Sequence, residues 1–187
     1  MTISTSKFFI EIGSSDFDTL LPLSEEGWRG IIVEPVSDLL YNLKKNDNVI
    51  FENCAISNYI GTTTVKYYDP KWAKEWTRGV GSISSINNFN TNPQWKEHVR
   101  EKTIPCMTLN KLLDKYKVEK INFLKIDTEG VEWLILDDYD WRILPEVLKI
   151  EHRHWRSHKI DADKYISLFK NMGYVVYEEE NDIYAIR

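Results

Sequence analysis

A group of carboxylates follows one short apolar segment of the chain. The segment 121–127 has the sequence INFLKID, so Asp127 closes it, and Glu129 and Glu132 follow directly. Such a segment is typical of a buried strand, and the carboxyl ends of parallel strands face the ligand cleft of an α/β protein. Favourable interaction with a helix dipole explains Glu129 and Glu132, but it does not explain Asp127. We therefore expect Asp127 and Glu129 to be catalytic and Glu132 to contact a substrate.

A second group of titratable side chains ends the next apolar segment of the chain. Its sequence is EHRH, from Glu151 to His154. If the strand continues through it, His152 and His154 share one face and Glu151 takes the other. We expect Glu151 or His152 to join the catalytic group, in which one side chain accepts a proton from a hydroxyl group, and we expect His154 to contact the substrate.

The same side chains raise the alternative of a metal site. Carboxylates with an imidazole suit Mg²⁺ or Mn²⁺, and Asp127, Glu129 and His152 are the candidate ligands. Charged residues at strand ends more often pair with Lys or Arg, so the favoured expectation is a site without a metal.

A glycine and an acidic residue indicate a nucleotide site near the start of the chain. Gly13 follows the apolar segment 7–12, and Glu34 closes the next one, 30–34, about 20 residues later. Glycine at a strand end permits a tight turn and close approach to a ligand. An acidic residue at this offset accepts hydrogen bonds from ribose hydroxyls.

The residues after Gly13 favour a cationic cofactor. The second and third glycines of a dinucleotide fingerprint are missing, and Asp16 and Asp18 would repel a pyrophosphate. S-adenosylmethionine carries a sulfonium and an ammonium group and no phosphate, so acidic side chains suit it. For Glu11 the alternative is a buried salt bridge to Lys125. The expected cofactor contacts are Glu11, Gly13, Ser14, Ser15, Asp16, Glu34, Pro35, Ala55 and Asp127.

Apolar strands alternate with helices along the chain, which predicts an α/β fold with a mostly parallel sheet and helices on both faces. The last two strands are joined by too few residues for a crossover, so we expect them to be antiparallel. The expected strands are 7–12, 30–34, 49–56, 61–68, 121–127, 147–151, 173–178 and 183–187, with helices ending near Gly27 and over 35–46, 108–116, 130–138 and 161–172.

Residues 69–100 interrupt this alternation. They contain Pro, Gly, Asn and Trp without a clear period, which indicates an insertion with short helices in a single domain, 1–187. Aromatic residues bind sugar rings and also pack in cores, so we expect a lid or substrate wall in which Trp76 and Ser82 contact the substrate.

Composition excludes several classes of partner. The 187 residues have a formal net charge of −5, which disfavours a nucleic-acid surface. No apolar segment approaches the length of a membrane span, and no signal peptide is recognisable. Cys54 and Cys106 lack metal-ligand spacing and are typical of buried thiols in a reducing compartment. We expect a cytoplasmic protein that acts on a small-molecule or glycan acceptor.

Four motifs together resemble the FkbM family of methyltransferases. They are FFIEIG at 8–13, VEP at 33–35, TLNKL at 108–112 and KIDTEGVE at 125–132, the most specific of them. The resemblance covers about residues 7 to 155. It implies a Rossmann-like class I methyltransferase fold with a seven-stranded sheet. It also implies methyl transfer from S-adenosylmethionine to a hydroxyl oxygen, often of a sugar or a polyketide. The chain has Glu11 and Asn110 where that family usually has Asp.

Two other functions are compatible with parts of the sequence. An NAD-dependent sugar oxidoreductase or epimerase usually has a Tyr-x-x-x-Lys pair, and Tyr41 and Lys45 have that spacing. They lie on the helix after the second strand, which is the wrong place for that chemistry. A non-catalytic nucleotide-binding domain is the second alternative, and the acidic residues Glu34, Asp127 and Glu129 argue against it.

Overall fold

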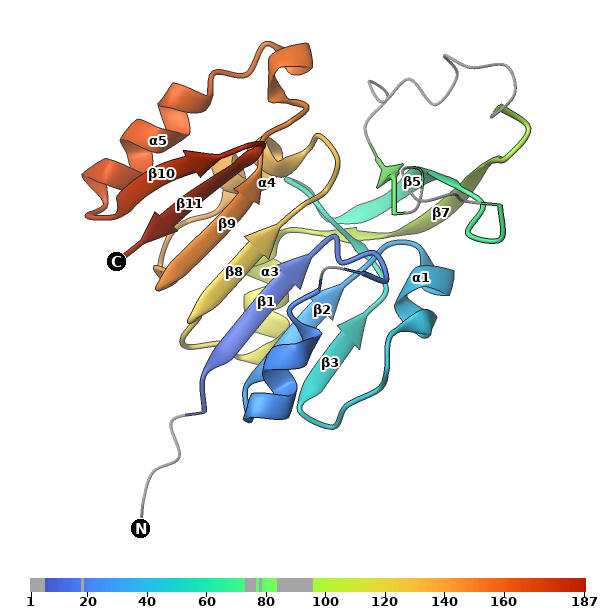
Figure 1. Ribbon diagram of the computed structural model, residues 1–187, viewed down its shortest axis with the longest axis horizontal. Coiled ribbons are helices and arrows are strands. Elements are labelled where there is room, and N and C mark those ends of the chain that lie inside the picture. The colour runs from blue at the N-terminus through green and yellow to red at the C-terminus, as the bar shows by residue number, and fades with distance from the viewer. Residues whose placement is uncertain (1–5, 18, 73–76, 78, 84–95) are drawn as a thin grey trace.

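The structure, a computed structural model, describes residues 6–17, 19–72, 77, 79–83 and 96–187 and is built on a seven-stranded sheet (Figure 1). The strand order is β10-β11-β9-β8-β1-β2-β3. Strand β11 pairs antiparallel with both of its neighbours, and every other pair is parallel. The expected α/β architecture with a mostly parallel seven-stranded sheet is therefore confirmed. The strands are β1 (Phe8–Ile12), β2 (Arg29–Val33), β3 (Val49–Glu52), β8 (Phe123–Ile126), β9 (Val147–Glu151), β10 (Val175–Glu179) and β11 (Asp182–Ile186).

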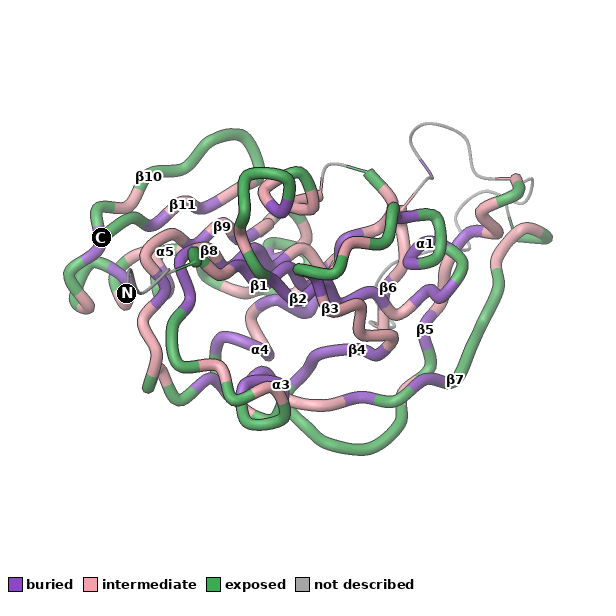
Figure 2. The backbone as a smooth tube through the Cα atoms, turned by 90° about the horizontal axis from the view of Figure 1, so that it is seen from below, coloured by how far each residue is buried: buried purple, intermediate pink, exposed green. Residues whose placement is uncertain are grey.

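Helices cover both faces of this sheet. Because successive strand residues point to opposite faces, Ile10 and Ile12 pack with α3, α4 and α5, whereas Phe9 packs with η1 and α1. The central strands β1, β2 and β8 are buried throughout most of their length (Figure 2). The helices are η1 (Leu21–Glu26), α1 (Ser37–Asn42), α3 (Leu109–Tyr116), α4 (Glu132–Asp138), η2 (Trp155–His158) and α5 (Ala162–Asn171).

Side-chain caps set the starts of two predicted helices. Thr108 accepts a hydrogen bond from the Lys111 backbone N–H at the start of α3, and Asp161 accepts one from Asp163 at the start of α5. The first two helices are shorter than expected. The loop after β1 stays open because the Glu34 and Glu11 carboxylates accept hydrogen bonds from the backbone N–H groups of Ser15 and Leu20.

A second, four-stranded sheet lies beyond the end toward which β1, β2 and β3 point (Figure 1). The sequence predicted 61–68 as a strand and missed 99–107, because exposed charged residues and Pro105 hide its pattern. Among the described residues, strand β4 pairs with Cys106 and Met107 alone, so it does not extend alongside Pro105. The strands of this second sheet, in the order β4-β7-β5-β6, are β4 (Ala55–Ile56), β5 (Gly61–Tyr68), β6 (Gly81–Ser82) and β7 (Val99–Met107).

This second sheet changes how residues 49–56 and 69–100 are understood. The predicted strand 49–56 divides, so that β3 joins the main sheet and β4 the second one. Between them, the Asn53 side chain donates hydrogen bonds to the backbone carbonyls of Glu34 and Pro35. Residues 69–98 of the predicted insertion connect the antiparallel strands β5 and β7, residues 99 and 100 belong to β7, and β6 pairs with β5. In the part of the chain that the structure describes, no helix has the length and apolar character needed to cross a bilayer.

Candidate functional site

A cavity lies where β1, β2 and β8 end, and it contains about 720 Å³ of empty space, part of it open to solvent. This volume is within the range of small-molecule sites. Segment 79–83 and the start of β4 close its other side. Most of the expected cofactor contacts and two of the expected catalytic residues line it, namely Gly13, Ser14, Ser15, Glu34, Pro35, Ala55, Asp127 and Glu129. Glu11, Asp16, Glu151 and His152 are not in its wall.

Gly13 shapes the floor of the cavity. Its φ angle is 80°, and a Cβ atom at this position would lie 1.7 Å from the backbone carbonyl oxygen of Asp127. The Gly13 N–H donates to Val33, and the Asp127 N–H donates to Ile12. The ends of the three strands are therefore held together at a point where no side chain fits, as expected for a glycine that permits close approach.

Glu34 is buried at the end of β2, with 4 % of its surface exposed. Its two carboxylate oxygens accept hydrogen bonds of 2.8 Å from the backbone N–H groups of Ser15 and Val36. Burial, with a smaller contribution from the Asp127 charge, raises the pKa of Glu34 to about 7, although these two hydrogen bonds oppose the change. Each oxygen keeps a second lone pair, so the side chain can still accept a hydrogen bond from the hydroxyl group of a ligand in the cavity.

Glu11 forms the salt bridge that was the alternative to a cofactor contact. Its carboxylate has no exposed surface and lies 3.0 Å from the Lys125 ammonium, and its other oxygen accepts the Leu20 N–H. Asp16 accepts a hydrogen bond of 2.8 Å from the Asn42 side chain. Because neither residue lines the cavity, we reassign both from cofactor contacts to residues that hold the loop after β1.

Asp127 and Glu129 bring acidic groups to the cavity from the end of β8. Burial and the neighbouring Glu129 charge raise the pKa of Asp127 to about 7, while Lys125 lowers it. Glu129 has a φ angle of 57°, which is uncommon outside glycine and places its side chain beside the cavity. A carboxyl group with a pKa near neutrality is suited to exchange protons at neutral pH.

The residues after β9 depart from the predicted alternation. Strand β9 ends at Glu151, and the chain then turns so that His154 becomes the N-cap of η2. His154 Nε2 lies 2.9 Å from the Glu129 carboxylate, whereas His152 Nε2 lies 3.6 Å from Glu178. The structure therefore does not place His152 beside Glu129, as the expected catalytic group and the alternative metal site require, and Glu151 and His154 are the residues that approach Glu129.

The acidic groups around Glu151 change its protonation. Burial and, after it, the charges of Asp127, Glu129 and Glu132 together raise the pKa of Glu151 to about 9, against the opposing charge of Arg153. The Glu129 hydrogen bond raises the pKa of His154. These carboxyl and imidazole groups form one acidic cluster that begins in the cavity wall and extends behind it.

Glu132 organises the turn between β8 and α4 instead of contacting a substrate. It is 1 % exposed, and its carboxylate accepts four hydrogen bonds. The donors are the Thr128 N–H and hydroxyl, the Gly130 N–H and the Trp155 indole N–H. The structure therefore places Glu132 in this turn and not in the cavity wall, where the expected substrate contact would require it.

Replacing Glu132 by Gln is expected to lower the free energy of unfolding by about 2 kcal/mol, because an amide NH₂ would then face buried N–H donors on one side. Urea denaturation followed by circular dichroism measures the change. Glu119→Gln, on an exposed glutamate, is the matched control and should leave the urea midpoint unchanged. An unchanged midpoint in the Glu132 variant would show that its hydrogen bonds do not stabilise the turn.

The segment before and within β6 covers the cavity. The Ser82 hydroxyl donates a hydrogen bond of 2.9 Å to the Glu129 backbone carbonyl, so it fixes this turn and is buried. A Cβ atom at Gly79 would lie 2.6 Å from the Ser15 hydroxyl oxygen. Trp76, the other expected substrate contact from this region, lies outside the described residues.

The cavity wall also contains residues that were not among the predicted contacts. Cys54, Gly79 and Thr128 all line the cavity. Burial raises the pKa of the Cys54 thiol to about 12, so it contributes a neutral, apolar wall. The sequence could have indicated Thr128 as a lining residue, because it directly follows Asp127. It could not have indicated Gly79, because the second sheet, which the sequence did not predict, brings this residue to the cavity.

Comparison with known proteins identifies one family. The model described as the methyltransferase FkbM domain matches residues 10–176, which is most of the chain. The matched range includes all the residues of the cavity wall. No curated protein and no solved structure gives a significant match.

Proposed function

The chain belongs to the FkbM family of methyltransferases, and from this premise we propose that it transfers a methyl group from S-adenosylmethionine to a hydroxyl oxygen of a sugar, a glycan or a small-molecule natural product. The observation that carries the proposal is the single cavity wall shared by Gly13, Glu34 and Asp127. In this wall, Gly13 lets the backbone come close to a ligand, Glu34 is a buried acceptor for the ribose hydroxyls, and Asp127 supplies an acidic group. These are the features that a cationic adenosine cofactor requires.

In the proposed complex, Glu34 accepts hydrogen bonds from the ribose hydroxyls of the cofactor. The backbone around Gly13, Ser14 and Ser15 lies along the remainder of the cofactor, and Pro35 and Ala55 contribute apolar contacts beside Glu34. The carboxylates at the end of β8 compensate the positive charges of the sulfonium and the ammonium.

We also propose that the main sheet has the Rossmann-like arrangement of class I methyltransferases. Two features support this assignment. The strand order reverses between β1 and β8, so that β2 and β3 lie on one side and β9 on the other. Ligands of doubly wound sheets bind outside the carboxyl ends of the strands at such a switch point, which is where the cavity lies.

The proposed reaction is a direct displacement in which the acceptor hydroxyl attacks the methyl carbon of the sulfonium. The protein aligns the two reactants and accepts the hydroxyl proton. Asp127 is the first candidate for this base, because it lines the cavity and its pKa is raised to about 7. Glu129 lies next to it in the same wall and is the second candidate.

The NAD-dependent alternative has less support at the site. The Tyr41 side chain is 70 % exposed on α1, and the Lys45 ammonium lies 5.5 Å from its ring. Neither residue lines the cavity. A tyrosine–lysine pair on the outer surface cannot reach a substrate bound beside β1 and β8.

The Glu34 carboxyl group is expected to make cofactor binding depend on pH. Below pH 7 the group is mostly protonated and has fewer oxygen lone pairs to accept hydrogen bonds. As the pH rises through about 7 it ionises and can accept hydrogen bonds from both ribose hydroxyls. We expect the affinity for S-adenosylhomocysteine to increase about tenfold from pH 6 to pH 8, because the ionised fraction of Glu34, which is the form that binds, increases about tenfold over this range. Isothermal titration calorimetry at several pH values measures this change.

The control for this experiment removes the second group that titrates in the same range. In an Asp127→Asn background the pH dependence should persist, and adding Glu34→Gln should abolish it and weaken binding at pH 8. If the Glu34→Gln variant keeps the full pH dependence of its parent, Glu34 does not bind the cofactor ribose.

A further inference from the structure

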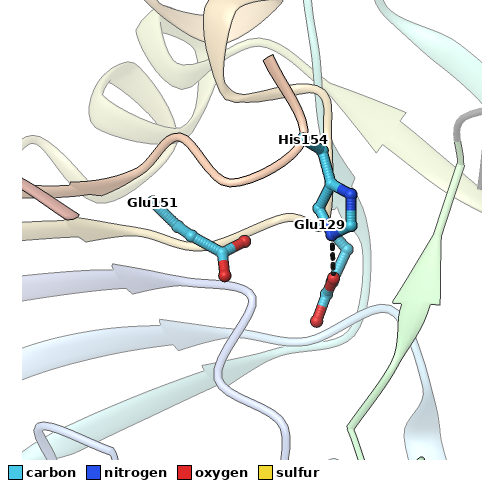
Figure 3. A group of neighbouring side chains, drawn as sticks. All are labelled: Glu129, Glu151 and His154. Atoms are coloured by element: carbon cyan, nitrogen blue, oxygen red, sulfur yellow. Dashed lines mark hydrogen bonds and ion pairs between the residues drawn. The ribbon is translucent and has the colours of Figure 1, made fainter. Parts of the chain in front are cut away.

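We propose that Glu129, Glu151 and His154 form a binding site for one divalent metal ion behind the wall of the cavity. The three residues come from separate segments, namely the turn after β8, the end of β9 and the N-cap of η2. One ligand atom of each lies within 4.8 Å of the others. Figure 3 shows the Glu151 carboxylate pointing toward the Glu129–His154 pair.

The spacing of these atoms fits a single ion. Divalent ions bind carboxylate oxygen and imidazole nitrogen at about 2.0–2.4 Å, so opposite ligands lie about 4.0–4.8 Å apart and neighbouring ones about 3 Å apart. His154 Nε2 and Glu129 Oε2 are 2.9 Å apart, which is the spacing of neighbouring ligand atoms around one ion. The three side chains would bind one ion with only small movements.

A second observation points to a cation at this place. The Oε2 atom of Glu151 is buried and accepts no hydrogen bond from the residues that the structure describes. Lys125, the basic residue of β8, already pairs with Glu11, and Arg153 is exposed. A buried carboxylate oxygen needs a partner, and a metal ion would supply it for Glu151 while neutralising Glu129.

The donor set selects the kind of ion. Carboxylates suit Mg²⁺, Ca²⁺ and Mn²⁺, and imidazole suits first-row transition metals, so two carboxylates with one imidazole favour Mn²⁺ among the oxygen-binding ions. Three protein ligands leave coordination positions for water or a substrate oxygen. Because Glu129 also lines the cavity, an ion here would be able to bind the acceptor hydroxyl and lower its pKa. This catalytic role rests on the proposed function, whereas metal binding does not.

Titration of the full chain with MnCl₂, with free Mn²⁺ followed by electron paramagnetic resonance, tests the site without cofactor or acceptor. We expect one ion to bind per chain. Glu151→Gln and His154→Gln should each weaken binding more than about 100-fold, because loss of even an outer partner of a ligand commonly costs 10- to 100-fold. His152→Gln is the matched control, since His152 lies two positions away and faces Glu178, and it should bind Mn²⁺ like the wild type.

A spectroscopic measurement on the bound ion keeps the test independent of folding defects in the variants. Electron spin-echo envelope modulation should detect an imidazole nitrogen on Mn²⁺ in the wild type and in His152→Gln. Absence of stoichiometric binding, absence of the nitrogen signal, or full affinity in Glu151→Gln would each overturn the site. Affinity for S-adenosylhomocysteine is measured on the same samples, so that failure of the metal site is distinguished from failure of the methyltransferase assignment.

Discussion

Replacing Asp127 by Asn is expected to lower the rate constant of methyl transfer by about 10²- to 10⁴-fold, which is the usual contribution of a general base. Asparagine keeps the size and hydrogen-bonding capacity of the side chain, but it cannot accept the hydroxyl proton. The cofactor should still bind, because Glu34 and the backbone around Gly13 remain. Transfer of a labelled methyl group to an acceptor found by screening sugars, glycans and natural products measures the rate, and titration with S-adenosylhomocysteine measures binding.

The control for this prediction is Asp47→Asn, on an exposed aspartate before β3, at the opposite end of the strands from the cavity. It removes the same charge and should leave the rate unchanged. Glu129→Gln separates the two candidate bases, because the one that accepts the proton should show the larger loss. An Asp127→Asn enzyme with wild-type turnover would exclude Asp127 as the base.

Replacing Gly13 by Ala is expected to lower the free energy of unfolding by at least about 3 kcal/mol. The new Cβ would lie 1.7 Å from the Asp127 carbonyl oxygen, and a backbone atom cannot move away without separating β1 from β8. Overpacking of this kind costs about 1–3 kcal/mol, and an L-residue in the left-handed conformation adds about 1–2 kcal/mol. Urea denaturation measures the loss, and the cavity should lose its ligand affinity as the strand ends separate.

Gly173→Ala is the matched control for the contribution of the left-handed conformation. Gly173 has a φ angle of 89°, and a Cβ atom there would meet no atom within 4 Å. It should therefore cost only about 1–2 kcal/mol, from the backbone conformation alone. Equal losses in the two variants would show that the close approach of Gly13 and Asp127 does not contribute to stability.

The cofactor half of the site was largely predictable from the sequence because it depends on local features. A glycine directly after a buried strand and an acidic residue at the end of the next one are fixed in place by parallel pairing of β1 with β2. The exception is Glu11. Its side chain points to the face opposite Ile10 and Ile12, toward Lys125, which the register between β1 and β8 places beside it.

The catalytic half of the site was less predictable because its side chains lie in the turns that follow the strands, and the conformation of these turns decides where each side chain points. Alternation placed His152 with His154, but β9 stops at Glu151 and the following turn directs each histidine separately. Glu132 was expected in the cleft, yet the turn before α4 directs it inward to four donors of this chain. Turn geometry of this kind follows from tertiary contacts that no short pattern contains.

The second sheet shows a different limit of sequence patterns. Strand β7 has a long exposed part and contains a proline, so neither hydrophobic alternation nor β-propensity identifies it. Strand β7 pairs with β5, and β5 pairs on its other side with β6, which places segment 79–83 over the cavity. The part of the cavity wall formed by Gly79, Gly81 and Ile83 therefore depends on long-range pairing and could be located only in three dimensions.

Calorimetric titration of the wild-type chain with S-adenosylhomocysteine and, separately, with NAD tests the assignment of the cavity most directly. We predict saturable one-to-one binding of S-adenosylhomocysteine, weakened by Glu34→Gln, and no heat of binding with NAD. Saturable binding of NAD in the absence of any binding of S-adenosylhomocysteine would contradict the account.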